Sequence, residues 1–181
     1  PYMKIGTKLL ILILTVSLLS CKSSTQKTET KEPATEFDFS GIKKRTFPES
    51  IGIINDYAQI LTESQRTELT KTLYDYNIET TRQIVVVTVD SIKPYQNIQQ
   101  YAVDLGNEWG VGDAEKNNGL TIVVCSQCRQ IGIATGFGTE LILTDTICKK
   151  VIDKIMIHEF KNGKFYDGIK KGVTELITKW G

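Results

Sequence analysis

The sequence predicts an α/β domain in which a small mixed sheet carries helices on both faces. Residues 83–89 read QIVVVTV, a nearly wholly apolar, β-branched run that is too short for a typical helix and indicates a buried central strand. Residues 120–125 and 129–134 read as two further strands around a short turn, which predicts a β-hairpin. Strands and helices alternate before the hairpin, and two helices follow it. That order is typical of a mixed sheet covered on both faces.

Two capping boxes predict where the first helices begin. Thr62 is followed by Gln65, and Asn97 is followed by Gln100. At this spacing the first side chain accepts a bond from a helix amide and the second reaches back to the cap. Apolar residues then recur at helical spacing, at Leu69, Leu73 and Tyr76 after the first box and at Ile98, Tyr101, Ala102, Leu105 and Trp109 after the second.

Two more helices are predicted after the hairpin. Thr144 and Asp145 can cap the first of them, and residues 161–164 break it. Its apolar side chains are Ile147, Val151, Ile155 and Phe160, and those of the last helix are Ile169, Val173, Leu176 and Trp180. Gly136 and Gly138 are expected to end the second hairpin strand.

The amino-terminal leader predicts export and lipid attachment. Met3 and two lysines precede an apolar run over residues 9–19, which is shorter than the ~20 apolar residues that span a bilayer. The run ends in Leu-Leu-Ser-Cys, which resembles the lipobox of bacterial lipoproteins. We therefore predict a signal peptide at residues 1–20 and a lipid anchor to the membrane at Cys21. The alternative is an ordinary signal peptide followed by an incidental cysteine.

Composition divides the remaining chain into a tether and one domain. Residues 21–47 are rich in Ser, Thr, Lys and Glu, so they form a flexible tether whose ends would lie about 25–30 Å apart. Residues 48–181 are enough for one core. Lys plus Arg number 22 against 21 for Asp plus Glu, and this balance does not suggest a nucleic-acid partner. We expect a monomeric domain in the cell envelope, in the periplasm.

Several short motifs, in this order, resemble the TPM domain family. They are residues 54–62 (INDYAQILT), the strand 83–89, Trp109-Gly110-Val111-Gly112, Asn118-Gly119-Leu120, Gly136-Phe137-Gly138-Thr139-Glu140, Asp145, Phe160 and Tyr166-Asp167-Gly168. The resemblance covers about residues 48–180. It implies a three-layer α/β/α sandwich on a central sheet.

Acidic and amide residues at the ends of the predicted strands, or in the loops between them, suggest a cation site. They are Asp56, Asp113, Asn118, Glu140 and Asp145. Ligands bind outside strand ends in α/β sheets, and several oxygen ligands suit Ca²⁺ or Mg²⁺. The resemblance implies the same, because cation binding and an acidic patch have been attached to TPM domains. The alternative is that each residue caps a helix or stabilises a turn locally.

Two functions remain open on the sequence. The first is a non-catalytic envelope module that binds a membrane-protein complex and assists its assembly or quality control. The second, which the resemblance also suggests, is a phosphatase that uses the acidic cluster. His158 is the only histidine and no phosphate-binding glycine motif is present, so the first is favoured. Cys125 and Cys128 flank the hairpin turn, where a structural disulfide is favoured over redox or zinc chemistry.

Overall fold

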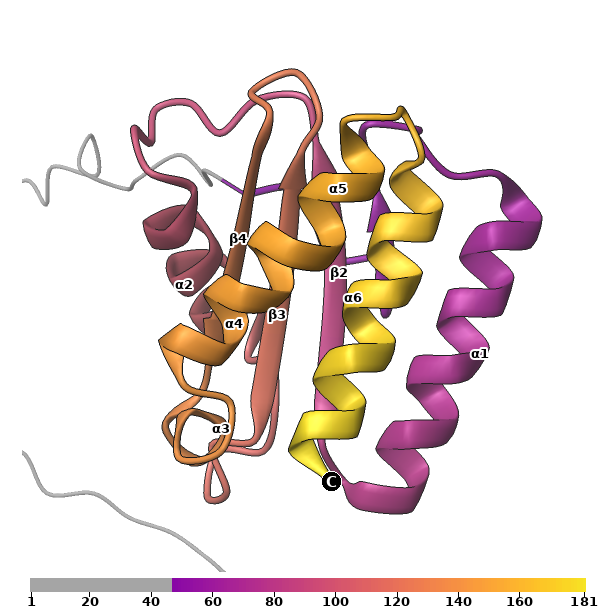
Figure 1. Cartoon of the computed structure of the whole chain (residues 1–181). Helices are drawn as coiled ribbons and strands as arrows, with labels where there is room; N and C mark the ends of the chain where they lie inside the picture. Colours follow the sequence, from indigo (N-terminus) through magenta and orange to yellow (C-terminus); the bar gives the residue numbers. More distant parts are fainter. Residues whose placement is uncertain (1–46) are drawn as a thin grey trace, which may run out of the picture. The chain divides into compact units, whose positions relative to one another are not determined.

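The structure is a computed structural model that describes residues 47–181 (Figure 1). The predicted signal peptide, Cys21 and all of the predicted tether except Phe47 lie outside the described residues. No helix within 47–181 is long and apolar enough to cross a membrane.

A four-stranded mixed sheet forms the centre of the domain. Its strands stand in the order β1-β2-β3-β4, with the first three parallel and the last antiparallel. Their bounds are Ile54–Asp56 for β1, Gln83–Val89 for β2, Gly119–Cys125 for β3 and Gln130–Thr135 for β4. The predicted central strand and hairpin are thus confirmed. The three residues of β1 add an edge strand that the sequence did not predict.

Helices cover both faces of this sheet, as predicted (Figure 1). Their bounds are Glu63–Thr80 for α1, Ile98–Trp109 for α2, Phe137–Glu140 for α3, Asp145–Val151 for α4, Ile157–Phe160 for α5 and Phe165–Trp180 for α6, with the π-helical turn η2 at Ile152–Met156 between α4 and α5. Helices α1, α4, α5 and α6 lie on one face and α2 lies on the other.

Alternate side chains of β2 enter two separate cores. Val86 is fully buried on the face that carries α1 and α6, whereas Val87 is fully buried against α2. Both parallel connections step in the same direction across the sheet, yet α1 and α2 lie on opposite faces. The two connections therefore have opposite hands. Crossover connections between parallel strands are nearly always right-handed. One of these two is therefore left-handed and is an exception to that rule.

The predicted caps are made only in part. Thr62 and Gln65 form the full capping box at the start of α1. Asn97 caps α2, but the side chain of Gln100 donates to Asp104 Oδ1 instead of returning to the cap. Thr144 makes no side-chain capping bond at all.

The helix predicted over residues 145–160 widens into a π turn in its middle. At this turn the fully buried Met156 packs against Gly172 of α6, where an added Cβ would lie 2.7 Å from Met156 Cγ. Gly168, one turn earlier, meets the ring of Phe160 in the same way. The two glycines of α6 thus let the neighbouring segment approach closely, and its side chains fill the space.

Candidate functional site

The five residues predicted to bind a cation do not lie together. Asp56 ends β1, where it is paired with Thr88, and Thr88 is paired with Val124 of β3. Asn118 comes immediately before the first residue of β3. The six steps from residue 118 to residue 124 span roughly 20 Å along a strand. Asp56 and Asn118 are therefore at opposite ends of the sheet and cannot share one ion.

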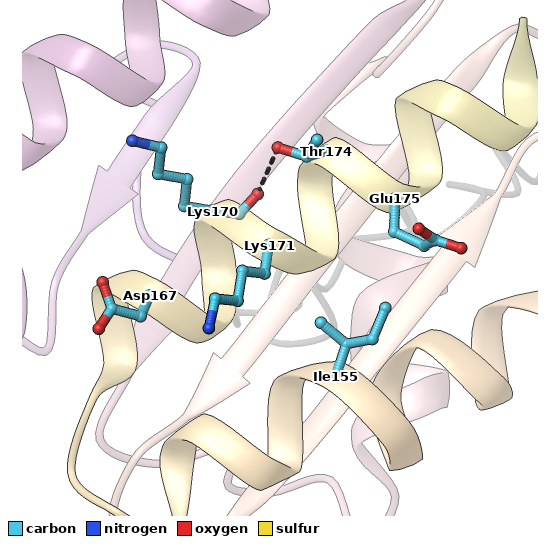
Figure 2. Close-up of a pocket in the computed structure, with 6 residues that line it drawn as sticks. All are labelled: Ile155, Asp167, Lys170, Lys171, Thr174 and Glu175. Carbon is cyan, nitrogen blue, oxygen red and sulfur yellow. Dashed lines mark hydrogen bonds between the residues drawn. The ribbon is translucent and has the colours of Figure 1, made fainter.

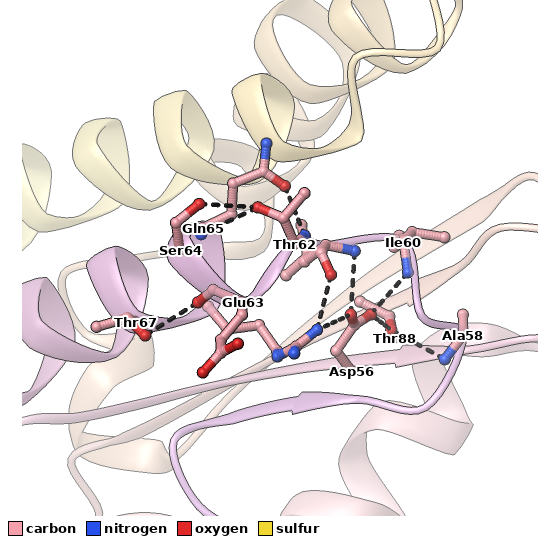
Figure 3. A network of polar contacts seen from close by, with 11 residues as sticks. Asp56, Ala58, Ile60, Thr62, Glu63, Ser64, Gln65, Thr67 and Thr88 are labelled. Atoms are coloured by element: carbon pink, nitrogen blue, oxygen red, sulfur yellow. Dashed lines mark hydrogen bonds and ion pairs between the residues drawn. The ribbon is translucent and has the colours of Figure 1, made fainter.

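Asp56 is held in a local network at the carboxyl end of β1 (Figure 3). Its side chain is only 2% exposed. It accepts hydrogen bonds from Ile60 N at 3.1 Å, Leu61 N at 3.0 Å and Thr88 Oγ1 at 2.5 Å, and it pairs with Arg66 Nη1 at 3.4 Å. These donors occupy both carboxylate oxygens. Asp56 therefore fixes the turn that leads into α1.

Asp113 and Asn118 fix the loop before β3 in a similar way. Asp113 Oδ1 accepts from the amides of Lys116 and Glu115, both at 2.9 Å, and these two bonds hold the pKa of the carboxyl below its usual value. Asn118 Oδ1 accepts from Asp113 N at 2.8 Å, and Asn118 Nδ2 donates to Thr81 O at 2.8 Å. The loop is thereby closed on itself and tied to the end of α1.

Helix α3 packs directly onto this loop. Gly138 N donates to Asn117 O at 3.0 Å, and the hydroxyl of the fully buried Thr139 donates to Gly119 O at 3.0 Å. A Cβ at Gly138 would collide with the carbonyl oxygen of Lys116. The glycines around residue 137 were predicted only to end a strand, but they also allow the backbone of α3 to approach the loop.

Glu140 and Asp145 lie at this same end of the sheet, because Thr135 at the end of β4 is paired with Leu120. Both carboxylates stand near Cys148. Burial, followed by the charges of Asp145 and Glu140, raises the pKa of that thiol to about 11. Four of the five predicted residues thus share one end of the sheet. Within residues 47–181, however, no three or more His, Cys, Asp or Glu side chains gather as a metal site would require.

The domain formed by residues 47–181 has known relatives. Residues 54–179 match the family model of the TPM domain. The chain belongs to the TPM domain family. A search of the curated proteins found no match to it.

Solved structures resemble this TPM domain over most of its length. The N-terminal domain of a protein from P. gingivalis has 28% identity and a TM-score of 0.65, and the match covers 70% of this chain and 80% of that one. The N-terminal domain of cg2496 from Corynebacterium glutamicum has 16% identity and a TM-score of 0.57, with 75% and 84% covered. BA42 from Bizionia argentinensis has 18% identity and a TM-score of 0.58, with 66% and 81% covered. The last two show the fold alone.

Cysteine placement in the TPM domain favours a structural role. Cys125 and Cys128 are bonded as a disulfide across the turn between β3 and β4, and Cys128 N also donates to Cys125 Sγ at 3.3 Å. Cys148 of α4 is a free cysteine and is buried.

A groove of about 530 Å³ lies between α6 and η2 (Figure 2). Both lysines of the groove are paired with acidic side chains outside it. Lys170 Nζ is 2.6 Å from Glu68 Oε1, and Lys171 Nζ is 2.6 Å from Glu159 Oε1. These pairs raise the pKa of both lysines and lower that of both glutamates. The groove therefore offers an anion little unbalanced positive charge.

One surface feature of the TPM domain was not predicted from the sequence. Phe137 and Leu141 are 81% and 84% exposed, although both are large and apolar. The sequence gives no sign of this exposure, because Phe137 lies between two glycines that were predicted only to end a strand, and the neighbouring Thr139 and Leu143 are fully buried.

Proposed function

We propose that this chain is a lipid-anchored TPM domain of the cell envelope that binds a membrane-protein complex and assists its assembly or quality control. One observation carries the preference for binding over catalysis. The loop carboxylates that were candidates for chemistry, Asp56 and Asp113, already accept bonds from nearby backbone amides. Such bonds make a rigid scaffold. They occupy both oxygens of Asp56 and Oδ1 of Asp113, and so leave those atoms little capacity to orient a water or a phosphoryl group.

The junction between the predicted tether and the domain supports this role. Phe47 is buried against Tyr101 and Tyr95, with ring centroids 5.0 and 5.7 Å away. Trp109 Nε1 donates to Pro48 O at 3.2 Å. A tether that leads into Phe47 would therefore join the domain on the α2 face. A lipid at Cys21 would hold the domain near the membrane and leave its other surfaces free to bind.

The phosphatase alternative needs several acidic groups to act on one phosphate. Asp56 is too far from the others to take part. Asp113, Glu140 and Asp145 are the predicted carboxylates that the structure leaves exposed, and of these Asp113 already accepts hydrogen bonds from two backbone amides. Phosphate release from p-nitrophenyl phosphate in the presence of Mg²⁺ separates the two functions. We expect none above background. Turnover that disappears in Glu140→Gln or Asp145→Asn would favour the phosphatase.

Anchoring is tested by Cys21→Ala in the full chain. The wild type should incorporate labelled palmitate and sediment with membranes, whereas the variant should do neither. Cys148→Ala is the matched control, because it removes a buried thiol that cannot be acylated in the folded domain. Equal labelling of Cys21→Ala and the wild type would refute the lipid anchor.

A further inference from the structure

Three exposed apolar side chains stand together at one end of the sheet. Phe137, Leu141 and Ile142 are 81%, 84% and 43% exposed, and we refer to them as the α3 knob. Phe137 and Leu141 are four residues apart and so project from the same side of one helical turn. Isolated exposed apolar residues are common, but adjacent ones of this exposure indicate an interaction surface.

The base of the α3 knob is rigid. Gly138 N and Thr139 N both donate to Asn117 O, at 3.0 and 3.3 Å, and Leu143 N donates to Thr139 O at 2.8 Å. Thr139 and Leu143 are fully buried directly beneath the exposed side chains. Binding would therefore order little backbone, and a fixed aromatic residue on such a base suits an interface anchor.

Acidic residues outnumber basic ones in the two segments that form and support the α3 knob. The loop 113–118 and the segment 137–145 together carry Asp113, Glu115, Glu140 and Asp145 against the single Lys116, four negative charges against one positive. The loop contacts α3 through Asn117. This net charge of −3 would repel a second copy presenting the same surface, and it would repel anionic lipid headgroups.

From these observations we infer that the α3 knob is the surface by which the domain docks onto its partner, and that the partner is a protein with an apolar pocket bordered by Lys or Arg. The inference rests on the proposed binding function and names the surface and chemistry that it uses. Phe137 and Leu141 would fill the pocket, and the acidic residues would set the orientation and speed the encounter.

Site-specific photo-crosslinking in the full chain tests this inference. p-Benzoylphenylalanine replaces Phe137 in one variant and Ile78 in another, and both are expressed in the native host. Ile78 is the matched control because it is a 63% exposed apolar residue on α1. Position 137 should give one protein adduct whose crosslinked peptide, mapped by mass spectrometry, lies beside Lys or Arg residues. Adding Glu140→Lys should lower the yield of that adduct by about tenfold, as expected for a lost charge pair near an interface.

Several results would overturn the inference. These are an adduct only with lipid, an adduct with a second copy of the chain, an equal yield at position 78, and a yield that Glu140→Lys leaves unchanged. Thermal unfolding of each variant establishes that it is folded. Native electrophoresis in mild detergent distinguishes a failure of the α3 knob from a failure of the proposed binding function. A wild-type chain in a larger assembly without a crosslink at position 137 refutes the α3 knob alone. A wild-type chain that migrates as a single copy refutes the binding function as well.

Discussion

Thr88 and Asp56 join the ends of two neighbouring strands. The hydroxyl of the fully buried Thr88 donates to Asp56 Oδ1 at 2.5 Å and accepts from Ala58 N at 3.2 Å. Asp56 in turn accepts hydrogen bonds from the backbone amides of Ile60 and Leu61. The carboxylate thus stabilises the entry to α1, and changes around it should affect folding stability.

Thr88→Val should destabilise the domain by about 1–3 kcal/mol, because a nearly isosteric side chain leaves the buried Asp56 oxygen and Ala58 N without their partner. Urea denaturation measures the loss. Thr67→Val is the control, since the Thr67 hydroxyl bonds Glu63 O on the exposed side of α1. Equal effects of the two substitutions would contradict the assigned role of Thr88.

Gly138→Ala should destabilise the domain by about 1–3 kcal/mol, the usual cost of overpacking, because the added Cβ meets the Lys116 carbonyl. Thr144→Ala should change stability by less than about 0.5 kcal/mol, since the hydroxyl makes no capping bond. Chemical denaturation of both variants checks the pair. A stable Gly138→Ala protein would mean that α3 does not pack on the loop as described.

Much of this fold could be predicted because its signals are local. The β-branched run of β2 and the cap at Thr62 each determine a strand or a helix start without help from distant residues. The π turn could not be predicted, because it depends on Met156 meeting Gly172 of another helix. The opposite hands of the two connections also arise from packing over the whole sheet.

The candidate site was predicted less well because strand ends were treated as equivalent. Asp56 follows a strand, whereas Asp113 and Asn118 precede one. In parallel strands these positions lie at opposite ends of the sheet, but the separation could not be inferred from the sequence because β1 was not predicted. The exposure of Phe137 could not be inferred either, because an apolar residue beside glycines gives no sign of whether it faces a core or solvent.

Asp113 should contribute to stability in a pH-dependent manner. Its pKa is lowered in the folded state by the amides of Lys116 and Glu115. A lowered pKa stabilises the fold above the unfolded value of about 3.9, and the contribution is lost as the pH falls through the folded value. Asp113→Asn should therefore be less stable than the wild type near neutrality, and the gap should narrow in acid. A gap that is constant across this range would contradict the assignment.

The predicted cation site can be tested at the end of the sheet where Asp113, Glu140 and Asp145 lie. If a cation binds at this end, millimolar Ca²⁺ or Mg²⁺ will raise the melting temperature of the mature chain by mass action on the folded state. Glu140→Gln combined with Asp145→Asn should abolish the shift. Asp56→Asn should lower the melting temperature yet keep the shift, since Asp56 is at the other end. The absence of any shift in the wild type would end the cation prediction.

The native size of the wild-type chain, solubilised from membranes in mild detergent, tests the proposed function most directly. We expect the chain, with its lipid anchor, to migrate in an assembly larger than one copy. Phe137→Asp with Leu141→Asp should release it as a single copy, while Tyr74→Asp with Ile78→Asp, an equally spaced exposed pair on α1, should leave the assembly intact. Migration of the wild type as a single copy would contradict the claim that this TPM domain is a binding module.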